Sequence, residues 1–246
     1  MGKVIAVASG KGGVGKTTLC AALSLCLSSD YKVLAADCDF GLGNLDTLFS
    51  LSDKIVYDVG DVLTGRCEFS RAVLLHPAKR KLHFLPASGG ELEDDIGQEA
   101  FLDLINSQRQ KYEYIFIDCP AGVGRYFKMA VAACDMALIV TTADKNAVRD
   151  ADRAAYVIEE CGAKDISLVI NCFDTSQLKK KGAMNIDDII DATKINLLGV
   201  VPEDPALRNA VFSSGEVFLK PSKGLVGIQN IAKRITGQRV PLMKLK

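Results

Sequence analysis

The sequence has no excess of charge of either sign, because its 30 lysine and arginine residues balance its 30 aspartate and glutamate residues. A balanced chain has no overall field that attracts nucleic acid or anionic lipid, so such binding has to be local or conditional. The sequence also lacks an uninterrupted apolar run of the ~20 residues that a membrane-spanning helix needs. No basic segment and apolar run of a signal peptide precede the first expected strand. We therefore expect a cytoplasmic protein.

None of the eight cysteines belongs to a Cys-x-x-Cys pair, and most lie in apolar runs such as Leu19–Ala21. This pattern favours buried, reduced thiols over disulfides or a structural metal. The chain also lacks an internal repeat, a low-complexity segment and an interdomain linker. Its length of 246 residues suffices for one large domain with a well-buried core. We expect a single domain over residues 1–237 and a short tail over residues 238–246.

Short apolar runs rich in β-branched residues alternate with helical patterns along the chain. Most runs are continuously hydrophobic, as in parallel strands that are covered on both faces. This alternation predicts an α/β fold, a doubly wound, mostly parallel sheet with helices on both faces, in three layers. The expected strands are Val4–Ala8, Lys32–Ala36, Leu82–Leu85, Tyr114–Ile117, Met136–Thr141, Ile166–Ile170 and Leu197–Val201. The expected helices are Thr17–Ser28, Glu99–Lys111, Gly124–Ala133, Asn146–Cys161, Asn185–Thr193 and Lys223–Ile235.

A glycine-rich stretch joins the first expected strand to the first expected helix. Residues 10–17 match the G-x-x-x-x-G-K-[ST] pattern of a phosphate-binding loop in the strand–loop–helix context that this pattern requires. Glycines let backbone N–H groups turn toward phosphate oxygens, and the helix N-terminus adds partial positive charge. Lys16 is predicted to reach the β- and γ-phosphates, and the Thr17 hydroxyl to bind Mg²⁺. A glycine-rich turn without a ligand explains the full pattern less well. The predicted phosphate-binding residues are Gly10, Gly12, Gly13, Val14, Gly15, Lys16 and Thr17.

Three aspartates follow expected strands, at the ends where ligands of a parallel sheet gather. Asp118 ends an apolar strand in the form of a Walker B motif, and it is predicted to help hold the Mg²⁺ shell. Asp37 and Asp39 follow the strand that ends at Ala36. Asp39 is a candidate to orient the attacking water, and Asp37 to support either the magnesium shell or the loop. Each of the three has a structural alternative, an acid that stabilises a turn.

The stretch Lys11–Thr18 resembles the deviant Walker A motif of the ParA/MinD ATPases, which has an extra lysine where this sequence has Lys11. The rest of the chain is most similar to the MinD septum-site-determining branch. Residues 37–46 resemble its switch I segment, and Asp118–Gly122 resembles its switch II segment. The resemblance covers nearly the entire chain in order. The predicted switch II residues are Pro120, Ala121 and Gly122.

This resemblance implies a Mg²⁺-dependent ATPase that binds ATP and ADP and forms a homodimer when ATP is bound. Lys11 would contact the phosphates of the partner subunit's nucleotide and, like an arginine finger, stabilise charge during phosphoryl transfer. A solvated loop lysine is the alternative. With Lys16 and Asp39, Lys11 completes the predicted catalytic set. Thr18 would bind the α-phosphate.

Further residues are assigned by resemblance alone. Asn171 resembles the position whose side chain recognises the adenine edge, and the segment that starts at Pro202 would contact the ring largely through its backbone. A strand-end turn and a helix N-cap are the structural alternatives. The charged face of the expected helix Asn146–Cys161 matches the region where the family meets its regulators, although a solvated helix face explains it as well. The adenine-binding candidates are Asn171, Pro202, Glu203 and Asp204, and the partner-binding candidates are Arg149, Asp150 and Arg153.

The resemblance also implies partners: a division inhibitor of the MinC type, and a regulator of the MinE or DivIVA-linked type that stimulates hydrolysis. It implies a cytoplasmic protein that can lie at the inner face of the cell membrane in its ATP state. The tail departs from the family pattern of a basic amphipathic helix. Pro241 cannot lie inside a helix with its full hydrogen bonding, and the five residues after it are too few to form a stable helix. We expect a feeble anchor or a frayed tail. Nucleic acid is not expected, although Lys179–Lys181 form a local basic cluster.

The sequence therefore predicts a MinD-like switch for placing the division septum. The alternative is a positioning ATPase of the ParA or flagellar-placement type that acts through DNA or a polar scaffold. A metallocluster carrier on the same scaffold would use a Cys-x-x-Cys pair, which the sequence lacks. A metabolic kinase or synthetase would need a pocket for a small-molecule acceptor, and the sequence gives no separate signal for one.

Overall fold

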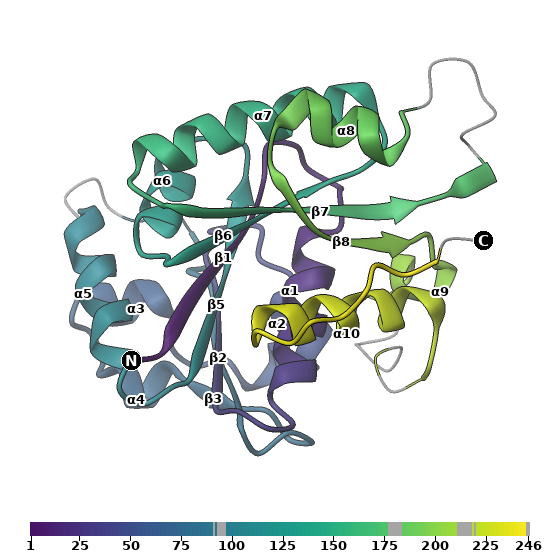
Figure 1. The fold of residues 1–246 in the computed structure, drawn as a ribbon. Helices are drawn as coiled ribbons and strands as arrows, with labels where there is room; N and C mark the ends of the chain where they lie inside the picture. The colour runs from purple at the N-terminus through teal and green to yellow at the C-terminus, as the bar shows by residue number, and fades with distance from the viewer. Residues whose placement is uncertain (91, 93–96, 177–183, 211–217, 219, 245–246) are drawn as a thin grey trace.

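The computed structural model describes residues 1–90, 92, 97–176, 184–210, 218 and 220–244. The fold is built on an eight-stranded sheet with the strand order β3-β4-β2-β5-β1-β6-β7-β8 (Figure 1). Neighbouring strands are parallel except β3 and β4, which pair antiparallel at one edge. The predicted mostly parallel sheet is thus confirmed. The strands are β1 (Lys3–Ser9), β2 (Val33–Asp37), β3 (Leu74–Leu75), β4 (Leu82–Leu85), β5 (Tyr114–Ala121), β6 (Met136–Thr141), β7 (Asp165–Phe173) and β8 (Asn196–Pro202).

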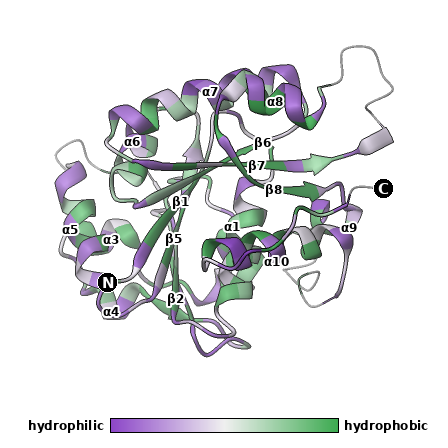
Figure 2. Cartoon of the chain, viewed as in Figure 1, coloured by the Kyte–Doolittle hydropathy of each residue, from purple (hydrophilic) through white to green (hydrophobic). Residues whose placement is uncertain are grey.

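Helices cover both faces of this sheet (Figure 1). The main helices are α1 (Lys16–Leu27), α5 (Gln98–Gln108), α6 (Arg125–Ala132), α7 (Lys145–Glu160), α8 (Ile186–Thr193) and α10 (Lys223–Ile235). The shorter ones are α2 (Leu45–Phe49), η1 (Ser52–Lys54), α3 (Val59–Leu63), α4 (Phe69–Ala72) and α9 (Pro205–Arg208). The helices alternate between hydrophilic and hydrophobic residues along their length, as helices that cover a sheet do (Figure 2).

The central strand β1 divides the interior into two hydrophobic layers. Its residues point alternately to opposite faces, so Ile5 and Val7 belong to one layer, and Val4 and Ala6 to the other. The first layer includes buried side chains of α1, α2 and α10, and the second includes those of α5, α6, α7 and α8. Burial on both faces explains why the strand reads as one continuous apolar run.

Two kinds of element differ from the sequence-based expectations. The antiparallel edge strand β3 and the short helices α2, α3, α4 and α9 were not predicted, because so few residues show no periodicity. β5 and β7 extend beyond their predicted ends, to Ala121 and Phe173. These extensions bring Asn171 and two of the predicted switch II residues, Pro120 and Ala121, into the sheet, at the edge where β1 ends.

The described tail residues 238–244 form no helix and run back along α10. Arg234 of α10 holds them, because its guanidinium donates to the carbonyl oxygens of Val240 at 3.1 Å and Pro241 at 2.8 Å. The cluster Lys179–Lys181 and the last two residues, 245 and 246, lie outside the described residues. None of the helices described here is long and apolar enough to cross a bilayer.

Candidate nucleotide-binding site

A cavity of about 680 Å³ opens at the carboxyl ends of the central strands. It is lined by the glycine-rich loop and the start of α1, by Asp39 and Ala121, and by the ends of β7 and β8. Among the predicted residues, its lining includes Gly12, Gly13, Gly15, Lys16, Thr17, Thr18, Asp39, Ala121, Asn171, Pro202, Glu203 and Asp204. The structure therefore brings together residues that are up to 192 positions apart, from Gly12 to Asp204. This is the edge at which parallel sheets bind ligands.

The glycine-rich loop is held tightly between neighbouring elements. A Cβ atom at Gly10 would collide with the backbone carbonyl of Asp150 in α7, and one at Gly15 would collide with the Asn171 side chain. Gly15 also has a φ of 86°, in the left-handed region that other residues rarely adopt. Both positions therefore require glycine, one because of close approach and the other because of close approach and backbone conformation.

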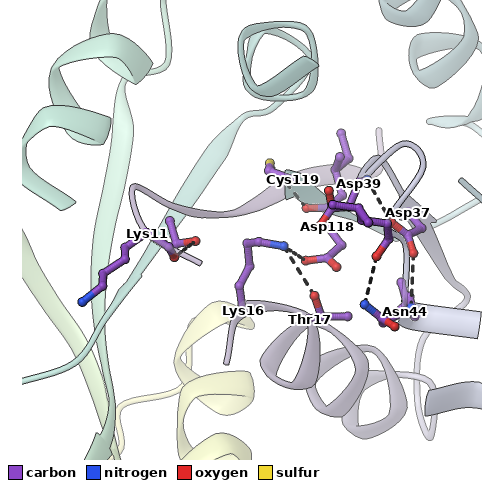
Figure 3. A network of polar contacts seen from close by, with 12 residues as sticks. Lys11, Lys16, Thr17, Asp37, Asp39, Asn44, Asp118 and Cys119 are labelled. Carbon is purple, nitrogen blue, oxygen red and sulfur yellow. Dashed lines mark hydrogen bonds and ion pairs between the residues drawn. The ribbon is translucent and has the colours of Figure 1, made fainter. Parts of the chain in front are cut away.

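Lys16 forms a buried ion pair at the bottom of the cavity (Figure 3). Its Nζ lies 2.9 Å from Asp118 Oδ1, and the exposed fractions of the two side chains are 7% and 0%. Burial alone lowers the pKa of Lys16, but attraction to Asp118 and the hydrogen bond to it outweigh this effect, so the pKa lies above its ordinary value. Lys16 is thus a fixed cation, as phosphate binding requires.

Asp37 is buried and supports the loop that follows β2. Its Oδ1 accepts from the backbone N–H of Asp39 at 3.0 Å, and its Oδ2 accepts from that of Leu45 at 3.2 Å. Burial and the nearby Asp118 raise the pKa of Asp37 to about 7, although the two hydrogen bonds oppose the rise. Of the two predicted roles, this geometry favours loop support, and the role in the magnesium shell stays a prediction.

Asp39 is half-buried and lines the cavity. Burial raises the pKa of its carboxyl group, while the Lys16 ammonium opposes that rise. Asn44 also lines the cavity, from the loop that Asp37 holds, and sequence reasoning did not single it out. Its place inside the segment that resembles switch I was the available signal.

Lys11 points in the opposite direction from Lys16 (Figure 3). Its Nζ lies 3.0 Å from Asp144 Oδ1, and the exposed fractions of the two side chains are 44% and 51%. Asp144 is the N-cap of α7, where it also accepts from the N–H of Ala147 at 3.0 Å. The hydrogen bond from Lys11 lowers the pKa of Asp144. Lys11 is not found among the described residues that line its own subunit's cavity.

The residues predicted to contact adenine also line the cavity. Asn171 is buried, and its Nδ2 donates to the carbonyl oxygen of Val14 at 2.8 Å. Asp204 caps α9 by accepting from the N–H of Ala206 at 3.0 Å, as its structural alternative proposed, and it also lines the cavity. Glu203 pairs with Arg208, a further lining residue that the sequence did not indicate.

The site fits a magnesium ion that arrives with phosphate. Asp118 Oδ2 is buried and accepts no hydrogen bond from any residue that the structure describes, so it has capacity for a cation. The Thr17 hydroxyl lies next to Lys16, with 3.4 Å between Oγ1 and Nζ. Within the described residues, no three His, Cys, Asp or Glu side chains are placed to hold an ion by themselves. Mg²⁺ commonly binds through one or two protein oxygens together with substrate phosphates, for which Thr17 and Asp118 suffice.

The partner-binding candidates lie on α7, and the backbone of one of them, Asp150, packs against Gly10 of the glycine-rich loop. Arg149 and Arg153 are exposed, and Arg149 Nη2 lies 3.7 Å from Asp150 Oδ1. Arg153 lines a groove of about 850 Å³ between α7 and the start of β8. This groove is larger than the cavity at the glycine-rich loop, but no predicted nucleotide-binding residue lines it. We therefore place the nucleotide site in the smaller cavity, where the phosphate-binding motif lies.

Known proteins resemble this chain over nearly its full length. Residues 5–217 match the CobQ/CobB/MinD/ParA nucleotide binding domain. The septum site-determining protein MinD of Synechocystis sp. is 37% identical, over 99% of this chain and 92% of that protein. The MinC:MinD cell division protein complex of Aquifex aeolicus contains a chain that is 33% identical, with a TM-score of 0.87 over 98% of each chain. The septum site-determining protein MinD of Pyrococcus horikoshii, complexed with Mg-ADP, is 27% identical, with a TM-score of 0.83 over 96% of each chain.

The sequence-based resemblance is thus confirmed by matches that cover the whole domain rather than the glycine-rich loop alone. The same matches account for the mostly parallel sheet. The chain belongs to the MinD family of septum site-determining proteins, among the ParA/MinD nucleotide-binding ATPases.

Proposed function

We propose that this protein is an ATP-dependent dimerisation switch that places the division septum. ATP binding brings two subunits together, the dimer recruits a division inhibitor of the MinC type, and slow hydrolysis resets it. The observation that carries this proposal is the direction of Lys11. Its side chain points away from the Lys16–Asp118 pair of its own subunit and is 44% exposed, so its ammonium group is available to a second subunit.

The cis half of the site has a defined division of labour. Lys16 binds the β- and γ-phosphates, and Thr18 binds the α-phosphate. Thr17 and Asp118 would hold Mg²⁺, which when bound would supply positive charge next to the transferred group. Asp39 lines the cavity beside these groups and orients the attacking water. Asp37 supports this work indirectly, because it fixes the backbone of Asp39.

The trans half of the site is supplied by the second copy. An added cation stabilises negative charge most strongly in a site from which water is excluded, and a γ-phosphate supplies more of that charge than ADP does. A dimer that closes around Lys11 therefore forms with ATP and falls apart after hydrolysis. Hydrolysis acts as a timer, and a regulator of the MinE or DivIVA-linked type shortens the delay by acting on α7 at Arg149, Asp150 and Arg153.

Recruitment of a MinC-type inhibitor is supported by the Aquifex aeolicus MinD, which was solved in a complex with MinC. Use of Mg²⁺ and an adenine nucleotide is supported by the Pyrococcus horikoshii MinD, which was solved with Mg-ADP. In our proposal Asn171 and the Pro202–Asp204 segment receive the adenine ring. A membrane surface is reached through the dimer, because two weakly binding tails held together bind far more tightly than one tail.

Sedimentation velocity of the full chain with Mg²⁺ and either ATP or ADP tests the proposal. We expect a dimer with ATP, a monomer with ADP, and return to monomer as ATP is consumed. Co-sedimentation with anionic liposomes then asks whether only the ATP state binds membrane. A chain that stays monomeric in saturating ATP contradicts the switch. If the dimer forms but does not bind liposomes, the switch stands, and the dimer attaches to a protein partner or to DNA instead of a membrane.

A further inference from the structure

One side chain joins the end of β7 to the glycine-rich loop. Asn171 is only 8% exposed, and its Nδ2 donates to the carbonyl oxygen of Val14 at 2.8 Å. The two residues are 157 positions apart in the sequence. Because a carbonyl oxygen can only accept, this contact fixes which way the amide faces, with its nitrogen toward the loop.

The contact acts on the peptide group between Val14 and Gly15. Val14 is bonded to Gly15, whose φ of 86° lies in a region that glycine enters and leaves at little cost. The peptide group between them is planar and trans, so the Val14 carbonyl and the Gly15 N–H point in opposite directions. A donor that holds the carbonyl therefore also holds the N–H. Gly15 lines the nucleotide cavity, where N–H groups of such loops meet phosphate.

Gly15 leaves room for this contact because it has no side chain. A Cβ atom at Gly15 would collide with Asn171 Nδ2, so the amide lies directly against the loop backbone. Asn171 itself is placed by the sheet, because the preceding Ile170 is paired with Val200 of β8 and with Thr141 of β6. The sheet thus provides the reference against which the Val14–Gly15 peptide is held.

We propose that Asn171 is a positioning residue of the phosphate loop, which holds the Val14–Gly15 peptide in its phosphate-binding orientation whether or not a base is present. The inference rests on the nucleotide site of the proposed function, and it adds a role to the contact with adenine that resemblance implies. A residue predicted to contact the base then also sets the affinity for the phosphates.

A ligand without a base separates the two roles. We would measure binding of ATP and of inorganic tripolyphosphate, each with Mg²⁺, to the full chain by calorimetry. The variant Asn171→Ala loses the donor, and the nearly isosteric Asn171→Asp places a carboxylate against the carbonyl. We expect Asn171→Ala to bind tripolyphosphate about tenfold more weakly, the effect of one lost buried hydrogen bond. Asn171→Asp should bind it more weakly still, because its charge also repels phosphate. Both variants should bind ATP more weakly as well. Ser167→Ala is the matched control, since it changes a polar side chain of the same strand that does not line the cavity, and it should bind tripolyphosphate as the wild type does.

Two results would overturn the proposal. Loss of ATP binding with unchanged tripolyphosphate binding would make Asn171 a base contact only, and unchanged binding of both ligands would remove it from the site. Melting temperatures within a few degrees of the wild type would show that the variants are folded. If they are not folded, amide exchange in the ligand-free wild type decides. Slow exchange of the Asn171 side-chain N–H protons supports the proposal, and exchange as fast as that of an exposed amide contradicts it.

Failure of the proposed function would look different. A wild type that binds neither ATP nor tripolyphosphate would contradict the nucleotide site itself. A wild type that binds both ligands but never dimerises would contradict the switch. The role of Asn171 would then still be tested by ligand binding to its variants.

Discussion

Two ion pairs of the same loop have nearly the same length and differ in almost everything else. Lys16 lies 2.9 Å from Asp118 and Lys11 lies 3.0 Å from Asp144, but the first pair is almost completely buried and the second is about half exposed. An exposed pair is screened by water and can exchange partners at little cost. A buried pair that loses one member leaves an uncompensated charge, which costs far more. Burial, rather than distance, therefore assigns the first lysine to its own subunit and leaves the second available to another.

The largest expected effect comes from the buried pair. In Lys16→Ala the phosphates lose their main cation and Asp118 loses its partner, so we expect ATP affinity to fall at least ~100-fold. Calorimetric titration with Mg-ATP measures this. Lys11→Ala, five residues earlier in the same loop, is the matched control. Equal ATP affinity in wild type and Lys16→Ala would show that burial does not assign the lysines as we describe.

Asp39 separates chemistry from assembly. It lines the cavity but is not a member of either ion pair. We expect Asp39→Ala to bind ATP and dimerise as the wild type does, and to hydrolyse ATP about 100-fold more slowly, the usual contribution of a general base. Phosphate release under single-turnover conditions checks the rate. Unchanged turnover would remove Asp39 from the predicted catalytic set.

The buried region should also have its own pH dependence. Because the pKa of Asp37 is raised to about 7 in the folded protein, the folded state binds more protons than the unfolded state between about pH 4 and pH 7. This contribution to stability is present at low pH and is lost as the pH rises through 7. In a Mg²⁺-free buffer, the free energy of unfolding of the wild type should fall between pH 5 and pH 7. In Asp37→Asn we expect this fall to be smaller by about 1–2 kcal/mol. Urea titrations at both pH values measure it, and parallel pH profiles would contradict the assignment.

The exposed pair should give the smallest effect. Asp144→Asn keeps an oxygen that can cap α7 but removes the charge that Lys11 faces. We expect ATP binding by the monomer to be unchanged and the dimer dissociation constant to change less than about threefold, as for a solvent-exposed pair. Sedimentation at several protein concentrations measures the constant. A change of more than tenfold would mean that Asp144 has a role in the dimer beyond its contact with Lys11.

Much of the phosphate end of the site could be predicted from the sequence, because its determinants are consecutive. Glycines, a lysine and a threonine at fixed spacing between a strand and a helix define both backbone shape and chemistry. The role of Asp37 was harder to predict from the sequence. Its role depends on where the backbone N–H groups of Asp39 and Leu45 lie after the loop folds, and the sequence left two roles open.

Long-range contacts of single side chains were not predictable. Lys11 and Asp144 are 133 residues apart, and the carboxylate belongs to a helix N-cap with no motif of its own. Asn171 was assigned to the base from resemblance, and nothing local to it indicates a bond to Val14. β3 and the short helices were not predicted for a related reason. They are stabilised by strand pairing and packing with distant residues, and they are too short to show a periodic sequence pattern.

The comparison of the two lysines is tested most directly by sedimentation velocity of Lys11→Ala with a non-hydrolysable ATP analogue, alongside a titration of the same nucleotide. Our account predicts that the variant binds the analogue within about threefold of the wild type, because the lost pair is exposed, yet remains a monomer where the wild type dimerises. A Lys11→Ala dimer as stable as that of the wild type would contradict the account, because the exposed lysine would then have no role in a second subunit.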